Sequence, residues 1–253
     1  MKTLLIELKR MYRNHTLQLS IFLLILIAVL GIALNEIYYS SLNDSRLLLL
    51  SLYNSFTQFT YLILAFVFIS VFCKDFQNGV YIWYKQMGYS FIKVIISKFF
   101  ALLITVLSTL NIIFILAQLF SNNEDYGFFC ISLVCVNLNI IYIIVLSLFL
   151  SIIFKKVIVS TLLMYGMYVL FNGLNLWLYG IFNPADSNSL TTYYLGRFIN
   201  ASQSHYSLSK INMSDELLRV SSITIPIIWS IALVIVAIFI EKFERKKVYE
   251  IKD

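Results

Sequence analysis

The residues that could carry chemistry are few, and the most informative of them lie between positions 74 and 98. Asp75 is expected to begin a short helix there, and Gly88 is expected to end it. Between them lies an apolar and aromatic patch formed by Val80, Tyr81, Trp83, Tyr84 and Met87. Such a patch is typical of a surface that docks into a groove on a partner protein. It is equally typical of a helix that rests among lipid headgroups, so composition alone leaves both interpretations open.

No catalytic motif accompanies this stretch. The chain contains no Walker A, HExxH or GxSxG sequence and no paired metal-ligand spacing. Its two histidines, His15 and His205, are isolated, and its three cysteines lie within or at the edges of apolar runs. We therefore expect a protein that is not an enzyme and that itself binds no cofactor or metal.

The composition is that of a membrane protein. Hydrophobic residues make up 60% of the 253 residues and charged residues only 13%, against roughly 45–50% and 25% in soluble domains. Six uncharged runs are long enough to cross a bilayer; by residue number they are 17–34, 56–73, 99–120, 128–154, 157–182 and 222–240. In lipid, each run must satisfy its own backbone hydrogen bonds and is therefore helical. The sequence predicts an all-α integral membrane protein in which residues 1–253 form one transmembrane domain.

Lysine and arginine divide unevenly between the connections of these runs. Four precede the first run, four lie between 74 and 98, two form the turn Lys155–Lys156, and five lie in the C-terminal tail. The opposite connections hold only Arg46, Arg197, Lys210 and Arg219. By the positive-inside rule, both termini and the stretch 74–98 face the cytoplasm, and the large loop 183–221 is external.

The first thirteen residues have the pattern of an interfacial helix. The apolar positions Leu4, Leu5, Leu8, Met11 and Tyr12 follow a period of 3.6 residues, and basic residues lie among them. The bases that would meet lipid headgroups are Lys2, Lys9, Arg10 and Arg13. A simple basic anchor explains the same pattern.

The stretch 74–98 resembles the connection between spans two and three in ABC exporter permeases of the type-2 class. That family has an acidic residue, then Gly-Thr, a Leu-rich stretch, Pro-x-Ser-Arg, and a Gly-Lys that enters the next span. The matching positions here are Asp75, Gly79-Val80, Gly88-Tyr89-Ser90 and Ser97-Lys98. The opening Glu7-Leu8-Lys9-Arg10 resembles the family's N-terminal elbow helix. The sequence departs from the pattern where Asp replaces Glu, Gly88 replaces Pro and Phe91 replaces Arg.

This resemblance implies a permease subunit in a bacterial plasma membrane. It would pair with a second copy or a related permease, and with two copies of a cytoplasmic ABC ATPase that bind ATP and Mg²⁺. The segment after span two would be a coupling helix seated in a cleft of the ATPase. The residues expected to carry this contact are Asp75, Gln77, Gly79, Trp83, Tyr84 and Lys85.

Three glycines in the fifth run recur every seven residues, at Gly166, Gly173 and Gly180, so they lie nearly on one face of a helix. Small residues permit close approach of membrane helices, and Asn172 beside them can bond across a helix pair. In type-2 exporters the first and fifth spans flank the interface between permeases. Packing within one subunit explains the same stripe.

The cargo implied is an amphipathic peptide or similar hydrophobic molecule, because the chain resembles the membrane subunits of staphylococcal phenol-soluble modulin exporters. Two other functions remain open on the residues alone. One is a membrane immunity or scaffold protein that sequesters a peptide without pumping it. The other is a secondary carrier, although no acidic residue lies in the middle of a run, where such carriers commonly place one.

Overall fold

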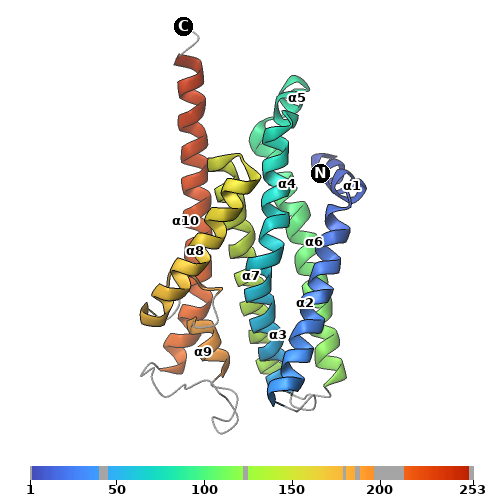
Figure 1. The fold of residues 1–253 in the computed structure, drawn as a ribbon, viewed down its shortest axis with the longest axis vertical. Coiled ribbons are helices and arrows are strands. Elements are labelled where there is room, and N and C mark those ends of the chain that lie inside the picture. The colour runs from blue at the N-terminus through green and yellow to red at the C-terminus, as the bar shows by residue number, and fades with distance from the viewer. Residues whose placement is uncertain are drawn as a thin grey trace.

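The computed structural model describes residues 2–39, 45–121, 125–178, 181–185, 189–196 and 214–250. Within these ranges the chain is helical and contains no strand (Figure 1). The helices are α1 (Lys2–Arg13), α2 (Thr16–Tyr39), α3 (Ser45–Phe59), η1 (Thr60–Leu64), α4 (Ala65–Gln77), α5 (Val80–Gln86), α6 (Phe91–Phe120), α7 (Tyr126–Phe154), α8 (Val157–Leu178), α9 (Leu190–Gly196) and α10 (Asp215–Glu250). Six helical stretches are long and apolar enough to cross a membrane. This confirms the prediction of six apolar spans and indicates a multi-pass membrane protein.

The second span is longer than the sequence indicates, because α3, η1 and α4 form one helical stretch from Arg46 to Gln77. The uncharged run in the sequence begins only at Phe56, after Arg46 and several Ser and Asn residues. The first turns of the stretch are buried against α2. Ser51 donates a hydrogen bond to the carbonyl of Gly31 at 2.8 Å. A Cβ at Gly31 would lie only 3.0 Å from the Ser55 hydroxyl oxygen, so glycine permits this close approach.

Helix α7 lies at the centre of the bundle and packs against α3, α4, α6, α8 and α10. Most of its side chains from Ile140 to Leu146 are buried. Its polar side chains bond inside the protein: Asn139 donates to the Tyr53 hydroxyl at 2.6 Å, and Ser147 donates to the carbonyl one turn earlier. By contrast α2, α6, α8 and α10 expose many large apolar side chains, as expected of helices that face lipid.

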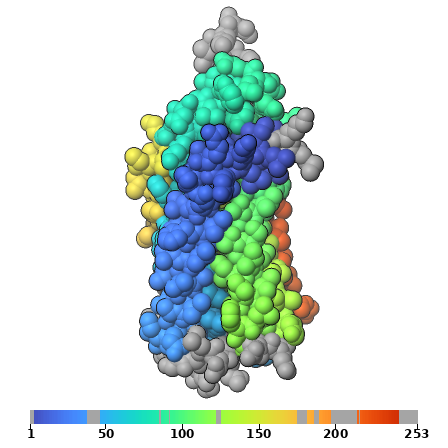
Figure 2. Space-filling model, turned by 90° about the vertical axis from the view of Figure 1, so that its right-hand side faces the viewer, coloured from blue at the N-terminus to red at the C-terminus, as the bar shows by residue number. Residues whose placement is uncertain are grey.

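Both terminal helices reach the same end of the molecule as α5 (Figure 1). Helix α1 lies across the ends of α2 and α6 and contacts these two helices. In Figure 2 it lies directly beneath α5. His15 turns the chain between α1 and α2 with a φ of 56°, a left-handed conformation that is uncommon outside glycine. Helix α9 lies at the opposite end, buried against α3, α7 and α10. Part of the predicted loop 183–221 is therefore folded into the bundle.

Two boundaries differ from the predictions in ways that matter for the site. Asp75 does not begin a short helix: it lies in the last turn of α4, and the short helix α5 begins only at Val80. Helix α6 begins at Phe91 rather than near Phe99. The connection between the second and third spans is therefore compact, and Lys98 belongs to a span rather than to a loop.

Candidate functional site

Helix α5 is set between two glycines with positive φ. Gly79, at 66°, separates α4 from α5, and Gly88, at 79°, ends α5 before α6. Side chains with a Cβ rarely adopt this conformation, so both turns favour glycine. Ser90 then caps α6 by accepting a hydrogen bond from the backbone N–H of Lys93 at 3.4 Å. These local signals turn the chain sharply and leave α5 as a short separate helix.

The outer face of α5 is apolar and exposed. Ile82 is 66% exposed and Trp83 55%, and Met87, in the turn directly after α5, is 53% exposed. In Figure 1 this helix projects beyond the ends of α4 and α6. A projecting apolar helix of this kind presents anchor side chains to a partner or to lipid headgroups.

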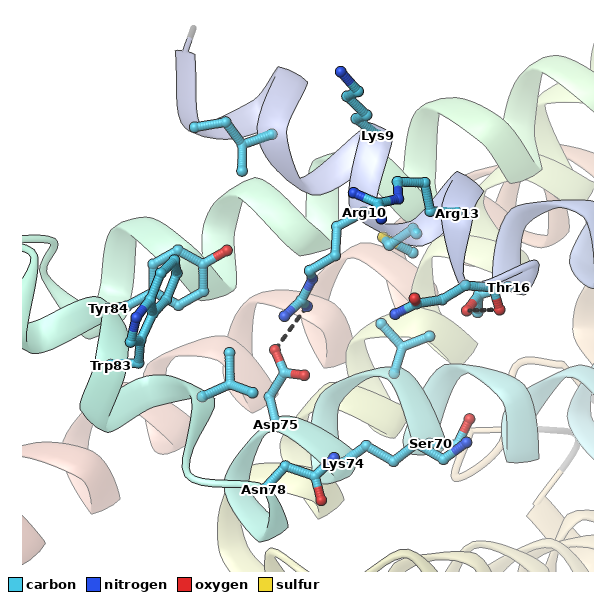
Figure 3. A pocket seen from close by; sticks show the side chains of 15 residues that line it. Lys9, Arg10, Arg13, Thr16, Ser70, Lys74, Asp75, Asn78, Trp83 and Tyr84 are labelled. Atoms are coloured by element: carbon cyan, nitrogen blue, oxygen red, sulfur yellow. Dashed lines mark hydrogen bonds and ion pairs between the residues drawn. The ribbon is translucent and has the colours of Figure 1, made fainter.

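Beneath α5 lies a cluster of four charged side chains from three helices. Arg10 of α1 donates to Asp75 of α4 at 2.7 Å (Figure 3). The same Nη2 atom of Arg10 lies 2.9 Å from Glu7 of α1. Lys98 of α6 forms a buried ion pair with Asp75 and donates to the carbonyl of Val71 at 3.2 Å. Glu7 and Lys98 are almost completely buried. We call these four residues, Glu7, Arg10, Asp75 and Lys98, the charge cluster.

Two tyrosines of α5 connect this helix to the charge cluster. Tyr84 donates a hydrogen bond to Glu7 at 2.6 Å, and the Tyr81 ring centroid lies 5.3 Å from the Lys98 ammonium. Burial, and then the bond to Glu7, raise the pKa of Tyr84 to about 12. Burial also raises the pKa of Tyr81 well above its usual value. Both phenols are therefore neutral over the physiological pH range, and α5 is tied to α1 and α6 through its inner face.

The charge cluster contains two acids and two bases, so its members neutralise one another. Moving single charges from water into such a site is costly, and pairing offsets that cost only when the hydrogen-bond geometry is good. Arg10 and Lys98 both donate hydrogen bonds to Asp75. Glu7 lies at ion-pair distance from Arg10 and accepts its hydrogen bond from Tyr84. The arrangement therefore holds the ends of α1, α4 and α6 in one fixed relation.

The structure divides the residues that the sequence predicts for the ATPase contact. Trp83 and Gln77 are exposed and Gly79 forms the turn, whereas Asp75 and Tyr84 are buried inside the subunit. Lys85 lies in α5, and its side chain is outside what the structure describes. Asp75 and Tyr84 thus position α5 and do not reach its outer face.

Sequence reasoning did not predict that Glu7, Arg10 and Lys98 would join Asp75 in a single site. Two signals for it were present. Glu7 and Arg10 have the i, i+3 spacing of a helical ion pair, and Lys98 is a single cation immediately before a long apolar run. Neither signal indicates which opposite charge each residue meets.

The glycine face of α8 is separate from this site. Gly166 and Gly173 are exposed, and an added Cβ at either would meet no atom within 4 Å. They therefore do not serve close packing within the described part of the subunit. Asn172 accepts a hydrogen bond from Asn183 at 3.3 Å, so it acts inside the subunit. Gly180 lies outside the described residues.

No group of three His, Cys, Asp or Glu side chains among the described residues is placed to hold a metal ion. Comparison of the chain with known protein families, with curated proteins and with solved structures found no match. The resemblance to type-2 exporter permeases therefore rests on the sequence motifs alone.

Proposed function

We propose that the protein is the permease subunit of an ATP-driven exporter of the type-2 class. One observation supports this most strongly. Four of the residues that carry the resemblance come from three distant stretches of the chain and meet in the charge cluster directly beneath α5: Glu7, Arg10, Asp75 and Lys98. A random likeness of short motifs would not require these positions to come together.

In this proposal α5 receives the movement of a cytoplasmic ATPase. Its outer face, with Ile82, Trp83 and Met87, docks on the ATPase, which binds ATP and Mg²⁺ and performs the hydrolysis. Its inner face is joined to α1 and α6 through Tyr84 and Tyr81. A displacement of α5 would thus be passed to three helices together, because a cluster of buried ion pairs resists separation of its members.

The arrangement of the spans supports assembly with a second permease. Helices α2 and α8 lie on either side of the α3–η1–α4 stretch in Figure 1, as the first and fifth spans would at a permease interface. The exposed glycines Gly166 and Gly173 on α8 leave room for close approach of another helix. The charge distribution supports a location in a bacterial plasma membrane with both termini in the cytoplasm.

We propose an amphipathic peptide, or a similar hydrophobic molecule, as the cargo. The membrane spans are almost free of charge, and the polar groups among them are mainly neutral amides and hydroxyls, such as the hydrogen-bonded pair of Asn111 and Asn137 at 2.8 Å. Spans of this composition suit a cargo that is itself partly apolar. Inside-out vesicles that contain the complex are expected to accumulate a labelled amphipathic peptide only when ATP is supplied.

Affinity purification of the tagged protein from its native membranes tests the proposal. An ATPase subunit in roughly equal amount should co-purify with the unmodified chain. The variant Trp83→Ala/Met87→Ala removes exposed apolar side chains from α5 and from the turn that follows it, and should lose this subunit. The matched control is Leu5→Ala/Tyr12→Ala on α1, whose side chains are 64% and 61% exposed at the same end of the molecule. This control should keep the ATPase. Recovery of no ATPase with any of the three proteins, under gentle extraction, would refute the proposal.

A further inference from the structure

A cavity of about 750 Å³ lies between α1, the first turn of α2, the last turns of α4, and α5. Arg10 crosses it to reach Asp75, with Trp83 and Tyr84 on one side and Arg13 and Thr16 on the other (Figure 3). Its volume is within the range of sites that hold small molecules. The proposed transport function assigns no role to this cavity.

The walls of the cavity carry a surplus of positive charge. Four cations line it, Lys9, Arg10, Arg13 and Lys74, against the single acid Asp75. Arg10 and Asp75 belong to the charge cluster, where their charges are balanced with those of Glu7 and Lys98. Lys9 and Arg13 on the α1 wall and Lys74 on the α4 wall form no ion pair with any described residue. Three unneutralised cations therefore lie on the walls of one cavity, and of these the Lys9 ammonium points away from Arg10 and Asp75 (Figure 3).

The polar groups of the cavity favour an anion with oxygen atoms. The Nε–H of Arg10 is buried and has no hydrogen-bond partner among the described residues. Asn14, Thr16 and Asn78 add side-chain amide and hydroxyl groups to the same walls. Guanidinium and ammonium groups combined with neutral donors are the usual ligands of a phosphate.

The position and the apolar wall of the cavity favour a phosphate carried by a lipid. The cavity lies where the span of α2 begins, at Thr16, and where the span of α4 ends, at Gln77. This is the level of the lipid headgroups. Ile6, Met11, Val71 and Val80, together with Trp83, form its apolar side. A phosphate can thus bind the cations while its acyl chains continue along apolar side chains.

We propose that this cavity binds the phosphate headgroup of an anionic phospholipid and so joins α1 to α4 and α5. The lipid acts as part of the structure of the subunit, because its phosphate neutralises cations on both walls. This inference requires only that the protein lies in a membrane. It shares Trp83 with the exporter proposal, and its test therefore leaves Trp83 unchanged.

The test is retention of phosphatidylglycerol by the full-length protein, measured by native mass spectrometry from an equal mixture with phosphatidylcholine in neutral detergent. The cavity variant is Arg13→Gln/Lys74→Gln, which removes one exposed cation from each wall. The matched control is Lys93→Gln/Lys156→Gln, which removes two exposed cations at the same end of the molecule that do not line the cavity. The unmodified protein and the control should each retain phosphatidylglycerol in preference to phosphatidylcholine. The cavity variant should bind it roughly tenfold to thirtyfold more weakly, because each basic group near an anionic lipid surface contributes on the order of 1 kcal/mol.

A second arm distinguishes a lipid from a free phosphate. Thermal unfolding of the unmodified protein should shift upward with phosphatidylglycerol at concentrations where inorganic phosphate has no effect. If the cavity variant has a lower unfolding temperature than the unmodified protein even without lipid, the retention test is repeated with the single variant Lys74→Gln, which changes only one exposed side chain. Equal retention of both lipids, or unchanged retention by the cavity variant, would overturn the proposal. Protection by inorganic phosphate but not by phosphatidylglycerol would overturn the assignment to a lipid.

Discussion

At the scale of single residues, the charge cluster determines how the helix ends at this site fit together. The sequence supports the choice of Asp75 as a site residue, but it does not show that Asp75 is buried. A carboxylate near the end of an apolar run normally faces water or headgroups. Here Lys98 and Arg10 lie on either side of it, from helices that are 23 and 65 residues away in the chain. Contacts of that sequence separation depend on how helices pack, which local patterns do not encode.

The pair of Asp75 and Lys98 gives a stability prediction. Asp75→Asn leaves a fully buried ammonium without its carboxylate, and Lys98→Met removes that ammonium. Asp75→Asn should reduce the free energy of unfolding by about 3–5 kcal/mol, because it leaves the buried ammonium unpaired. Lys98→Met should cost less, because Asp75 keeps its ion pair with Arg10. In the double variant, the free energy of unfolding should fall by much less than the sum of the two single losses. Chemical unfolding in detergent measures this free energy for the unmodified protein, the two single variants and the double variant. Strictly additive losses would show that the two side chains are not coupled.

Tyr84 gives a prediction for alkaline pH. Its pKa is raised to about 12 in the folded protein, against about 10 for an ordinary tyrosine. The folded state therefore holds this proton more tightly, and the stability gained from the neutral phenol is present below pH ~10 and lost as pH rises through ~12. The difference in unfolding temperature between the unmodified protein and Tyr84→Phe should be constant up to pH ~10 and shrink above it. A difference that stays constant throughout this alkaline range would contradict the bond to Glu7.

At the scale of elements, the apolar runs predicted every span, because membrane helices are recognised by length and hydropathy. The sequence did not predict the π-helical turn η1 in the middle of the second span. Thr60 and Tyr61 in this turn are buried, and Tyr165 of α8 donates a hydrogen bond to the carbonyl of Leu62 at 2.6 Å. The Tyr61 and Tyr168 rings lie 4.8 Å apart. The turn thus depends on partners from α8, and these contacts cannot be read from residues 60–64 alone.

The π turn gives a prediction about deletions. A π turn contains one residue more than an α turn, so deleting Leu62 should convert it to regular helix and keep α3 and α4 in their present orientation. Deleting Val67 from α4 should instead rotate the following residues by about 100° and move Asp75 away from Lys98. The first deletion should give a folded protein in size-exclusion chromatography and the second should not. Equal loss of folded protein would show that the turn has a required role of its own.

At the scale of the whole molecule, the exposed glycine face of α8 makes assembly testable. Gly173 has space around it in the single chain, so Gly173→Leu should leave the unfolding temperature nearly unchanged. If two permeases meet at this face, the bulky side chain should lower the fraction of dimer found by cross-linking in native membranes. The matched control is Val169→Leu, since Val169 is a 69% exposed residue on the same helix that already carries a branched side chain. Equal dimer fractions in both variants would place the interface elsewhere.

Docking of α5 on a separate ATPase can be tested by photo-crosslinking in native membranes. A photoreactive phenylalanine derivative replaces Trp83 in one protein and Tyr12 of α1 in another. Both positions are exposed aromatic residues at the same end of the molecule. We expect the probe at position 83 to form a covalent adduct with an ATP-binding subunit and the probe at position 12 to form none. Adducts with lipid alone at both positions would contradict the account and identify α5 as a headgroup-level helix.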